Sequence, residues 1–154
     1  MVDLRTEFAG LRLRNPTMLA SGFLDETGGS LLRVYRAGAG AVVTKSIGPE
    51  PREGYANPTV VELDAGLLNA VGLPNPGLEA FRRELEEAVG AKALVIASVF
   101  GKDAAEYARV AAGLADAGVA AIEMNLSCPH AKGLGSEIAQ SEDAVREFTR
   151  VVKD

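Results

Sequence analysis

The chain has 154 residues, of which 47% are hydrophobic and 24% are charged. A chain of this length and composition folds into one domain with a buried core, which excludes disorder and low complexity. The 16 Lys and Arg against 21 Asp and Glu give a net charge of −5. Such a balance provides no basic surface, so we expect neither nucleic acid nor a membrane as a partner.

The sequence also argues against membrane spans, secretion and metal binding. The longest apolar stretch, residues 93–100, is far shorter than the roughly 18 residues of a membrane span. Asp3 and Arg5 place charges where a signal peptide would be apolar. Cys128 and His130 are the single cysteine and histidine, too few for an internal disulfide or a structural zinc site. We therefore expect a cytoplasmic protein without a metal site.

Short β-rich segments alternate with helical segments, which is the pattern of βα units around a parallel sheet. A hairpin is predicted first, from residues 4–8 and 11–13 around Gly10. The units that follow are strand 17–20 with helix 30–37, strand 41–45 with helix 78–89, strand 94–99 with helix 104–117, and strand 120–125 with a helix starting at 141–143.

Four consecutive βα units make half of an eight-stranded barrel. The predicted fold class is α/β of the (βα)8 TIM-barrel type, with residues 1–154 as one domain that supplies the N-terminal hairpin and the first four units. A doubly wound open sheet is the alternative. Its dinucleotide-binding glycine motif is missing, because Gly38-Ala39-Gly40 precedes a strand instead of following one.

The connection after the second strand is unusually long. Residues 46–76 contain five prolines and a predicted hairpin that pairs residues 59–63 with 67–70. Loops of this length inside a compact domain are usually functional.

Reactive groups in parallel βα architectures lie at the carboxyl ends of the strands, because these ends fix positions while the following loops vary. We expect the groups at these ends to converge on one face, together with a glycine-bearing part of the long loop. The candidates are Ala20, Ser21, Gly22, Thr44, Lys45, Ser46, Ser98, Asn125, Cys128 and His130 at strand ends, and Asn69, Ala70, Val71, Gly72 and Leu73 in the long loop.

Each candidate also has a structural interpretation. Lys45 is either a lysine that extends from the rim to water or a cation held in a partly dry site for an anionic ligand. Asn69 and Asn125 are also common turn formers. A lone cysteine is most often inert and buried, but Cys128 follows a strand end in a loop that would present its thiol. His130 is a general base or a surface residue.

Four segments of the chain together resemble the class 1 dihydroorotate dehydrogenases. They are NPTMLASG (15–22), GAVVTKS (40–46), GLLNAVGLPNPG (66–77) and EMNLSCPH (123–130), in the same order and with the same spacing. The resemblance runs along the whole chain and covers the first half of the family's barrel.

The resemblance implies FMN-dependent oxidation of (S)-dihydroorotate to orotate in pyrimidine biosynthesis, the route to UMP. It assigns Cys128 as the base that removes the C5 proton while hydride leaves C6 for the flavin. A thiol titrates nearer neutrality than a hydroxyl, which suits it to this role. The substrate contacts that it implies are Lys45, Asn69, Ala70, Val71, Gly72, Leu73 and Asn125, and the FMN contacts are Ala20, Ser21, Gly22, Lys45, Ser46, Ser98 and Asn125.

Within class 1, the segment at residues 48–55 is most similar to the 1B branch. This similarity implies a partner subunit that carries FAD and an iron–sulfur cluster and passes electrons to NAD, and hence a homo- or hetero-oligomer. Two residues depart from the branch: Ser98 and His130 stand where asparagine is common. The Ser-Cys-Pro-His form also resembles dihydropyrimidine dehydrogenase, which acts on uracil and thymine. A non-catalytic half-barrel that assembles with another half is the alternative of a different class.

The family's barrel continues beyond residue 154. Phosphate groups in such barrels are commonly held by the loops after strands seven and eight. We therefore expect this chain by itself to bind FMN poorly and to turn over little.

Overall fold

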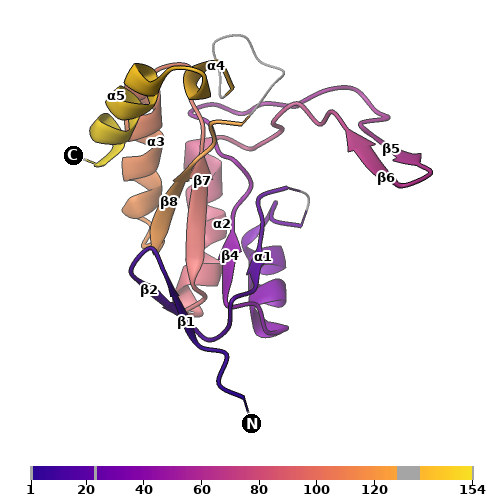
Figure 1. Ribbon diagram of the computed structural model, residues 1–154, viewed down its shortest axis with the longest axis vertical. Helices are drawn as coiled ribbons and strands as arrows, with labels where there is room; N and C mark the ends of the chain where they lie inside the picture. The colour runs from indigo at the N-terminus through magenta and orange to yellow at the C-terminus, as the bar shows by residue number, and fades with distance from the viewer. Residues whose placement is uncertain (1, 23, 128–135, 154) are drawn as a thin grey trace.

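The computed structural model describes residues 2–22, 24–127 and 136–153. Figure 1 shows the arrangement of the elements. In chain order they are β1 (Thr6–Phe8), β2 (Leu11–Leu13), β3 (Met18–Leu19), α1 (Gly28–Arg36), β4 (Ala41–Val43), β5 (Val60–Leu63), β6 (Gly66–Asn69), α2 (Leu78–Gly90), β7 (Val95–Val99), α3 (Ala104–Ala115), β8 (Ala121–Met124), α4 (Ser136–Ala139) and α5 (Glu142–Lys153).

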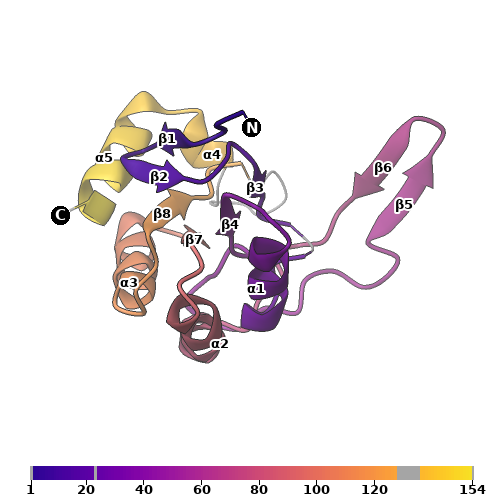
Figure 2. The same ribbon diagram turned by 90° about the horizontal axis from the view of Figure 1, so that it is seen from below.

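A parallel sheet in the order β3-β4-β7-β8 forms the centre of the molecule. Figure 2 shows this sheet from below, with α1, α2 and α3 arranged along its outer side. Each strand is followed by at least one helix, and sequential units lie next to each other. This arrangement confirms the predicted fold class, half of a (βα)8 barrel.

The main core lies between the sheet and the helices. β4 and β7 consist of short, nearly continuous apolar runs, and every residue of both strands is buried, as expected for parallel strands covered on both faces. The helices contribute Leu31, Phe81 and Leu114, each of them fully buried. Burying side chains of this size is the main favourable contribution to folding.

The inner face of the sheet carries a second, smaller core. Leu13 from β2 packs with Ala41 and Val43 of β4 and with Ile96 of β7. The hairpin β1–β2 crosses the amino-terminal end of the sheet (Figure 2), so it covers the end opposite to the one where reactive groups are expected.

Helices α1 and α2 pack very closely at the start of α1. A side chain at Gly28 would overlap the backbone carbonyl of Glu84 in α2, and the Gly28 N–H donates to the Glu84 carboxylate at 3.0 Å. Thr27 caps α1: its hydroxyl accepts from the Ser30 N–H, and its own backbone N–H donates to the Ser30 hydroxyl.

Several boundaries differ from those predicted. Helix α1 starts at Gly28, not at residue 30, because Thr27 is the cap and glycine is tolerated in the first turn. β4 ends at Val43 and not at residue 45: the Thr44 N–H still donates to the Ile96 carbonyl of β7, but the Lys45 N–H turns to the Asp25 carbonyl. The four-residue helix α4 falls in a predicted loop. Helix α5 begins at Glu142, within the range that the sequence indicated.

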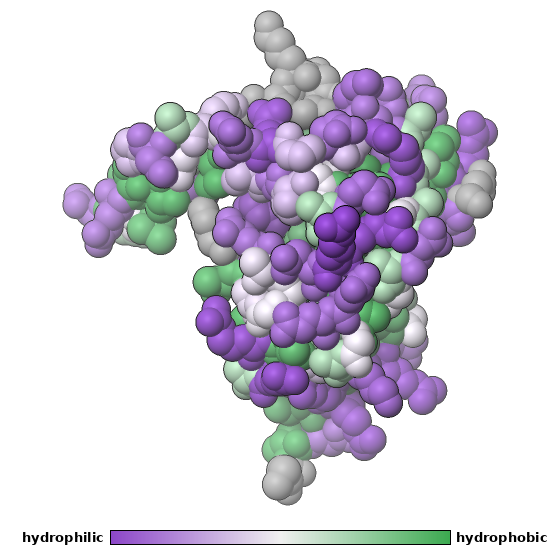
Figure 3. Space-filling model, turned by 180° about the vertical axis from the view of Figure 1, so that it is seen from behind, coloured by the Kyte–Doolittle hydropathy of each residue, from purple (hydrophilic) through white to green (hydrophobic). Residues whose placement is uncertain are grey.

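The hairpin β5–β6 projects from the rest of the molecule (Figure 1). We call it the ribbon, residues 60–69. All eight residues of its strands are exposed, including Leu67 at 72% and Leu68 at 59%. Figure 3 shows apolar side chains, in green, gathered on this projection. In the described residues, no helix is long and apolar enough to cross a bilayer.

Candidate functional site

Polar side chains from three strand ends form one hydrogen-bonded network at the carboxyl edge of the sheet. Ser46 follows β4, Ser98 lies near the end of β7, and Asn125 follows β8. The Ser46 and Ser98 hydroxyl oxygens are 2.9 Å apart, and the Asn125 Nδ2 donates to the Ser46 Oγ at 2.8 Å. Ser98 is fully buried and Ser46 is nearly so, so this network is held away from bulk water. The predicted convergence of these three residues is present in the structure.

Buried backbone contacts fix the network. The Thr44 hydroxyl donates to the Lys45 carbonyl at 2.8 Å and accepts from the Ser98 N–H at 3.0 Å. The Asn125 N–H donates to the Val99 carbonyl at 2.9 Å. These bonds attach the ends of β4 and β8 to β7, so the functional side chains stand on rigid elements.

The network borders a cleft of about 550 Å³. This volume is in the range of small-molecule sites, which typically combine apolar walls with a few placed polar groups. The cleft is lined by Ala20, Ser21, Ser46, Glu123, Met124, Asn125, Leu126 and Ser127. Ser21 joins the network loosely, with its Oγ 3.4 Å from that of Ser46.

Lys45 is buried, with 8% of its surface exposed, and it lies beside a different cavity. Its ammonium donates to the Gly22 carbonyl oxygen at 2.5 Å. The cavity that it lines measures about 370 Å³ and also contains Asn75, Glu26 and Glu84 in its walls. The structure therefore joins Lys45 to the end of β3 and leaves it outside the lining of the larger cleft.

Asp25 and Asn75 are buried polar residues near Lys45 that the sequence analysis missed as site residues. The Asp25 Oδ2 accepts from the Gly22 N–H at 2.6 Å. Burial raises the pKa of this carboxyl, while the Gly22 hydrogen bond and the positive charge of Lys45 act against that shift. The available signal for Asp25 was its place between the first predicted strand and the helix that follows it.

Asn75 organises the end of the long loop. Its Oδ1 accepts from the Gly48 and Gly77 N–H groups at 3.2 and 3.0 Å, and its Nδ2 donates to the Leu73 carbonyl at 3.0 Å. The Pro-Asn-Pro sequence at 74–76 was the available signal, because asparagine side chains in turns commonly bond to backbone groups two residues away.

The segment expected to hold the substrate ring has other partners in this structure. Asn69 is exposed at the end of the ribbon, and Ala70, which follows the ribbon, is exposed as well. Beyond them, the Val71 carbonyl accepts from the Tyr55 N–H at 3.0 Å, and the Gly72 carbonyl accepts from the Arg52 Nε at 2.6 Å. These hydrogen bonds tie Val71, Gly72 and the following Leu73 to residues 52–55. Contact of Asn69–Leu73 with a substrate stays a prediction.

Cys128 and His130 lie outside the described residues. The chain is described up to Ser127, which lines the cleft and whose N–H and hydroxyl both donate to the Asn125 Oδ1 at 3.1 Å. Cys128 is the next residue along the chain.

Tyr107 supports the site from the helix layer and was also missed from sequence. It is fully buried, its hydroxyl donates to the Asn125 carbonyl at 2.7 Å, and its ring meets Phe148 of α5 edge-on at 5.4 Å. At helical spacing, an aromatic residue is indistinguishable from ordinary core in sequence.

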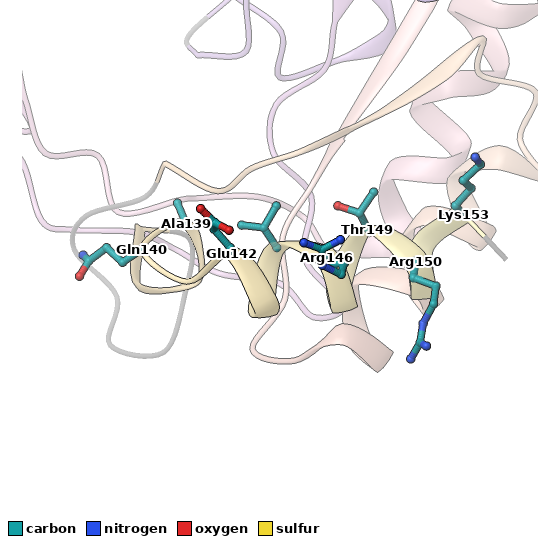
Figure 4. A pocket seen from close by; sticks show the side chains of 8 residues that line it. Ala139, Gln140, Glu142, Arg146, Thr149, Arg150 and Lys153 are labelled. Carbon is teal, nitrogen blue, oxygen red and sulfur yellow. The ribbon is translucent and has the colours of Figure 1, made fainter.

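Another cavity lies along α5. Figure 4 shows the side chains that line it, among them Arg146, Arg150 and Lys153. It measures about 740 Å³, but its charged side chains are exposed and carry no buried polar network of the kind found at the strand ends. Within the described residues, no cluster of His, Cys, Asp or Glu could hold a metal ion.

Comparison with known proteins gives a family match over nearly the whole chain. The family model described as dihydroorotate dehydrogenase matches residues 3–154. It therefore includes both the strand-end network and the segment that follows it.

Curated relatives are about 50% identical to the chain over the aligned residues. The protein named dihydroorotate dehydrogenase B (NAD(+)), catalytic subunit, of Methanosarcina mazei is 54% identical over 147 residues, covering 94% of this chain and 47% of the relative. Proteins of the same name from Pyrococcus furiosus and Thermoplasma acidophilum are 50% and 48% identical, with 99% of this chain covered in each case and 50% and 51% of the relatives. The chain thus spans about half the length of these relatives.

Solved structures with a similar fold belong to proteins with lower identity. The ligand-free type DHODH from Eimeria tenella superposes with a TM-score of 0.81 at 23% identity, covering 98% of this chain and 45% of that one. The complex of the Eimeria tenella protein with ferulenol gives a TM-score of 0.80 at 22% identity and covers 43% of that chain. These superpositions support the barrel-type fold.

Proposed function

Because the chain belongs to the dihydroorotate dehydrogenase family, we propose that it provides the strand-end half of an FMN-dependent site that oxidises (S)-dihydroorotate to orotate, as in the class 1B enzymes. The observation that carries the proposal is the network of the buried Ser46 and Ser98 with the partly buried Asn125, at the edge of a 550 Å³ cleft. It lies at the carboxyl ends of the strands, where barrel enzymes hold their reactants.

The chemistry of this network fits a flavin. The polar edge of the flavin ring carries both hydrogen-bond donors and acceptors, and hydroxyl and amide side chains can serve either type. The network residues Ser46, Ser98 and Asn125 provide such groups, and Ala20, Ser21 and Gly22 would add backbone contacts at the end of β3. FMN, when bound, supplies the two-electron chemistry by accepting hydride.

The protein's own residues would then orient the substrate and accept its proton. Asn125 is shared between the two ligands in this proposal, since its Nδ2 and Oδ1 lie at the wall of the cleft. Cys128, three residues further along, is proposed as the base that takes the C5 proton. A thiolate is accessible near neutral pH without a strong partner base, which suits this position.

Lys45 is proposed to favour the substrate's carboxylate. Its ammonium is nearly buried and is held by a carbonyl oxygen, and a cation in such a poorly solvated place attracts an anion more strongly than one in water. Asn69 with Ala70, Val71, Gly72 and Leu73 remains the proposed second contact to the substrate. For these residues to act, the segment from the ribbon to Leu73 would have to approach the cleft.

The names of the curated relatives describe a catalytic subunit that uses NAD(+). We propose on this basis that the protein works with an electron-transfer subunit that carries FAD and an iron–sulfur cluster, in the cytoplasm. Its acidic net charge is compatible with a small-molecule pathway and offers no attraction to nucleic acid.

A half exchange with a relative tests the proposed function. Residues 1–154 would replace the matching half of the Pyrococcus furiosus catalytic subunit, which is 50% identical, and dihydroorotate oxidation would be measured with an artificial electron acceptor. We expect a yellow protein that oxidises dihydroorotate. The Cys128→Ser variant should keep the flavin and lose at least about a hundredfold in rate, the usual contribution of general base catalysis.

The same hybrid discriminates between the candidate functions. Dihydroorotate carries a carboxylate and dihydrouracil does not, so Lys45→Met should reduce turnover of dihydroorotate far more than that of dihydrouracil. Equal losses, or a hybrid that prefers dihydrouracil, would favour the free-pyrimidine alternative. A folded hybrid that never acquires flavin would contradict the proposal and favour a half-barrel with an assembly role.

A further inference from the structure

Asp25 is a fully buried carboxyl that the proposed function does not use. Its side chain has no exposed surface, and one oxygen, Oδ2, accepts from the Gly22 N–H at 2.6 Å. The other oxygen, Oδ1, has no hydrogen-bond partner among the described residues. A buried polar atom without a partner destabilises the folded state, so the presence of an acid here calls for a reason other than stability.

Gly22 connects Asp25 to Lys45 through its two backbone polar groups, which belong to successive peptide units. Its N–H is held by the Asp25 carboxylate, and its carbonyl oxygen accepts from the Lys45 ammonium at 2.5 Å. In addition, the Lys45 backbone N–H donates to the Asp25 carbonyl at 3.2 Å. Together these bonds form a closed circuit between the turn that follows β3 and the end of β4.

We propose that Asp25 is a positioning residue for Lys45: its carboxylate holds the backbone of Gly22 at the N–H, and the carbonyl oxygen of the same residue holds the Lys45 ammonium. The inference rests on the proposed function in one respect, that Lys45 is the cation that meets the anionic substrate. Hydrogen bonds to a carboxylate and from an ammonium are stronger than neutral ones, so this circuit can hold a long side chain that would otherwise sample many rotamers.

The other charged groups around Lys45 are placed differently. Glu26 and Glu84 line the same cavity; Glu84 accepts from the Gly28 N–H at 3.0 Å, and Glu26 is exposed. Asp25, in contrast, accepts from the N–H of Gly22, the residue whose carbonyl oxygen holds the ammonium. The positive charge of Lys45 also opposes the upward shift that burial imposes on the pKa of Asp25, which is consistent with their proximity.

Amine labelling of the unliganded chain tests this arrangement. A limiting amount of an acylating reagent would be added, and the extent of labelling at Lys45 would be compared with that at exposed Lys92 by peptide mass spectrometry. In Asp25→Ala the Gly22 N–H loses its acceptor. The ratio of labelling at Lys45 to labelling at Lys92 should then rise about tenfold, because a hydrogen bond to a charged group is worth at least that factor. Asp25→Asn retains a neutral acceptor for the Gly22 N–H, so its ratio should stay well below that of Asp25→Ala.

Glu26→Ala is the matched control, since it removes the neighbouring carboxylate from the same cavity and should leave the ratio unchanged. Thermal unfolding of all variants separates positioning from a general loss of structure. A merely structural acid would change labelling only together with the melting temperature. An unchanged ratio in folded Asp25→Ala, or a ratio in Asp25→Asn as high as in Asp25→Ala, would overturn the proposal.

Hydrogen exchange keeps the proposal testable if Asp25→Ala does not fold. The Gly22 amide of the unsubstituted protein and of Asp25→Asn should then exchange at least about tenfold more slowly than an unstructured glycine, and intrinsic exchange rates in either protein would overturn the proposal. Neither experiment involves flavin or dihydroorotate. The half exchange could therefore succeed even if these two experiments overturned the role of Asp25. Equally, a failed half exchange would not contradict the hydrogen bonds between Asp25, Gly22 and Lys45.

Discussion

The central strands and the ribbon have similar apolar sequences and opposite environments. β7 reads VIASV and is buried throughout, whereas β5 reads VVEL, pairs with the equally apolar β6, and is exposed throughout. The difference is the cover: β7 has helices on its outer side and a neighbouring strand on each edge, and the ribbon has a single partner strand. An apolar run therefore predicts a strand, but other layers of the fold decide whether that strand is buried.

The same comparison of the central strands with the ribbon explains why the candidate site lies at the strand ends. Thr44, Ser46 and Ser98 are buried at the end of the covered strands. There the Ser46 and Ser98 hydroxyls bond to each other, and the Thr44 hydroxyl bonds to backbone groups of Lys45 and Ser98. Such groups keep one orientation. Asn69 lies in the ribbon and is exposed, so water competes for each of its hydrogen bonds.

The largest expected contrast comes from deleting matched apolar side chains. Phe81→Ala removes a fully buried ring and should lower the free energy of unfolding by about 3–5 kcal/mol. Leu67→Ala on the ribbon, where the side chain is 72% exposed, should change it by less than about 0.5 kcal/mol. Urea denaturation measures both. A large loss at Leu67 would mean that another surface covers the ribbon in solution.

A second test compares hydroxyl groups. Thr44→Val keeps the shape of the side chain but leaves the buried Ser98 N–H without its acceptor, which should cost about 1–3 kcal/mol. Thr59→Val, next to the ribbon, removes only a long contact of 3.4 Å to the Asn57 side chain and should cost less than about 0.5 kcal/mol. Equal effects in denaturation would show that the Thr44 bond contributes little to joining β4 and β7.

These tests also mark what the sequence could predict. The alternation of strands and helices gave the half-barrel, because each period follows directly from which faces must be apolar. The convergence of Ser46, Ser98 and Asn125 followed from the rule for strand ends. The sequence analysis did not identify Asp25 or Tyr107, because their partners are a turn peptide and a backbone carbonyl, and backbone partners leave no trace in residue identity.

The position of the ribbon was also beyond the sequence. Its pairing was anticipated, with residues 67–70 expected where the structure has Gly66–Asn69. Its projection depends on the paths of residues 46–59 and 70–76, which are set by contacts such as that of the Arg52 Nε with the Gly72 carbonyl. The sequence analysis expected Asn69 and Lys45 on one face, because the sequence does not reveal these paths. The common role of the two residues stays a prediction.

Helix capping gives a smaller expected effect. The Asp103 carboxylate accepts from the Glu106 N–H at 2.9 Å at the start of α3, so Asp103→Ala should destabilise the protein by about 1 kcal/mol. Asp64→Ala at the turn of the ribbon is the counterpart, with an expected change below about 0.5 kcal/mol. Thermal unfolding of the two variants side by side would show whether the cap matters more than an exposed turn acid.

The smallest expected effect is a pH dependence at Asp25. Since its pKa in the folded state is raised above the ordinary value of 3.8, the folded protein binds this proton more tightly than the unfolded chain. The resulting stabilisation is complete below the unfolded pKa and is lost as pH rises through the folded one. Asp25→Asn should therefore be at least as stable as the parent near pH 7, with a difference that shrinks as the pH falls towards 3.8.

That difference is expected to be small, because the Gly22 hydrogen bond and the Lys45 charge offset part of the desolvation. Denaturation midpoints of both proteins across pH 3.5–7 would measure it. A variant that is less stable than the parent at neutral pH would mean that the carboxylate gains more from Gly22 and Lys45 than it loses by burial.

One missing methyl group determines the separation of two helices. With any residue larger than glycine at position 28, α1 would have to retreat from the carbonyl of Glu84, and Thr27, which lines the cavity beside Lys45, would retreat with it. Substitutions at this point would thus change the width of the cavity beside Lys45 without contacting the lysine, so the packing of α1 on α2 sets part of the lysine's surroundings.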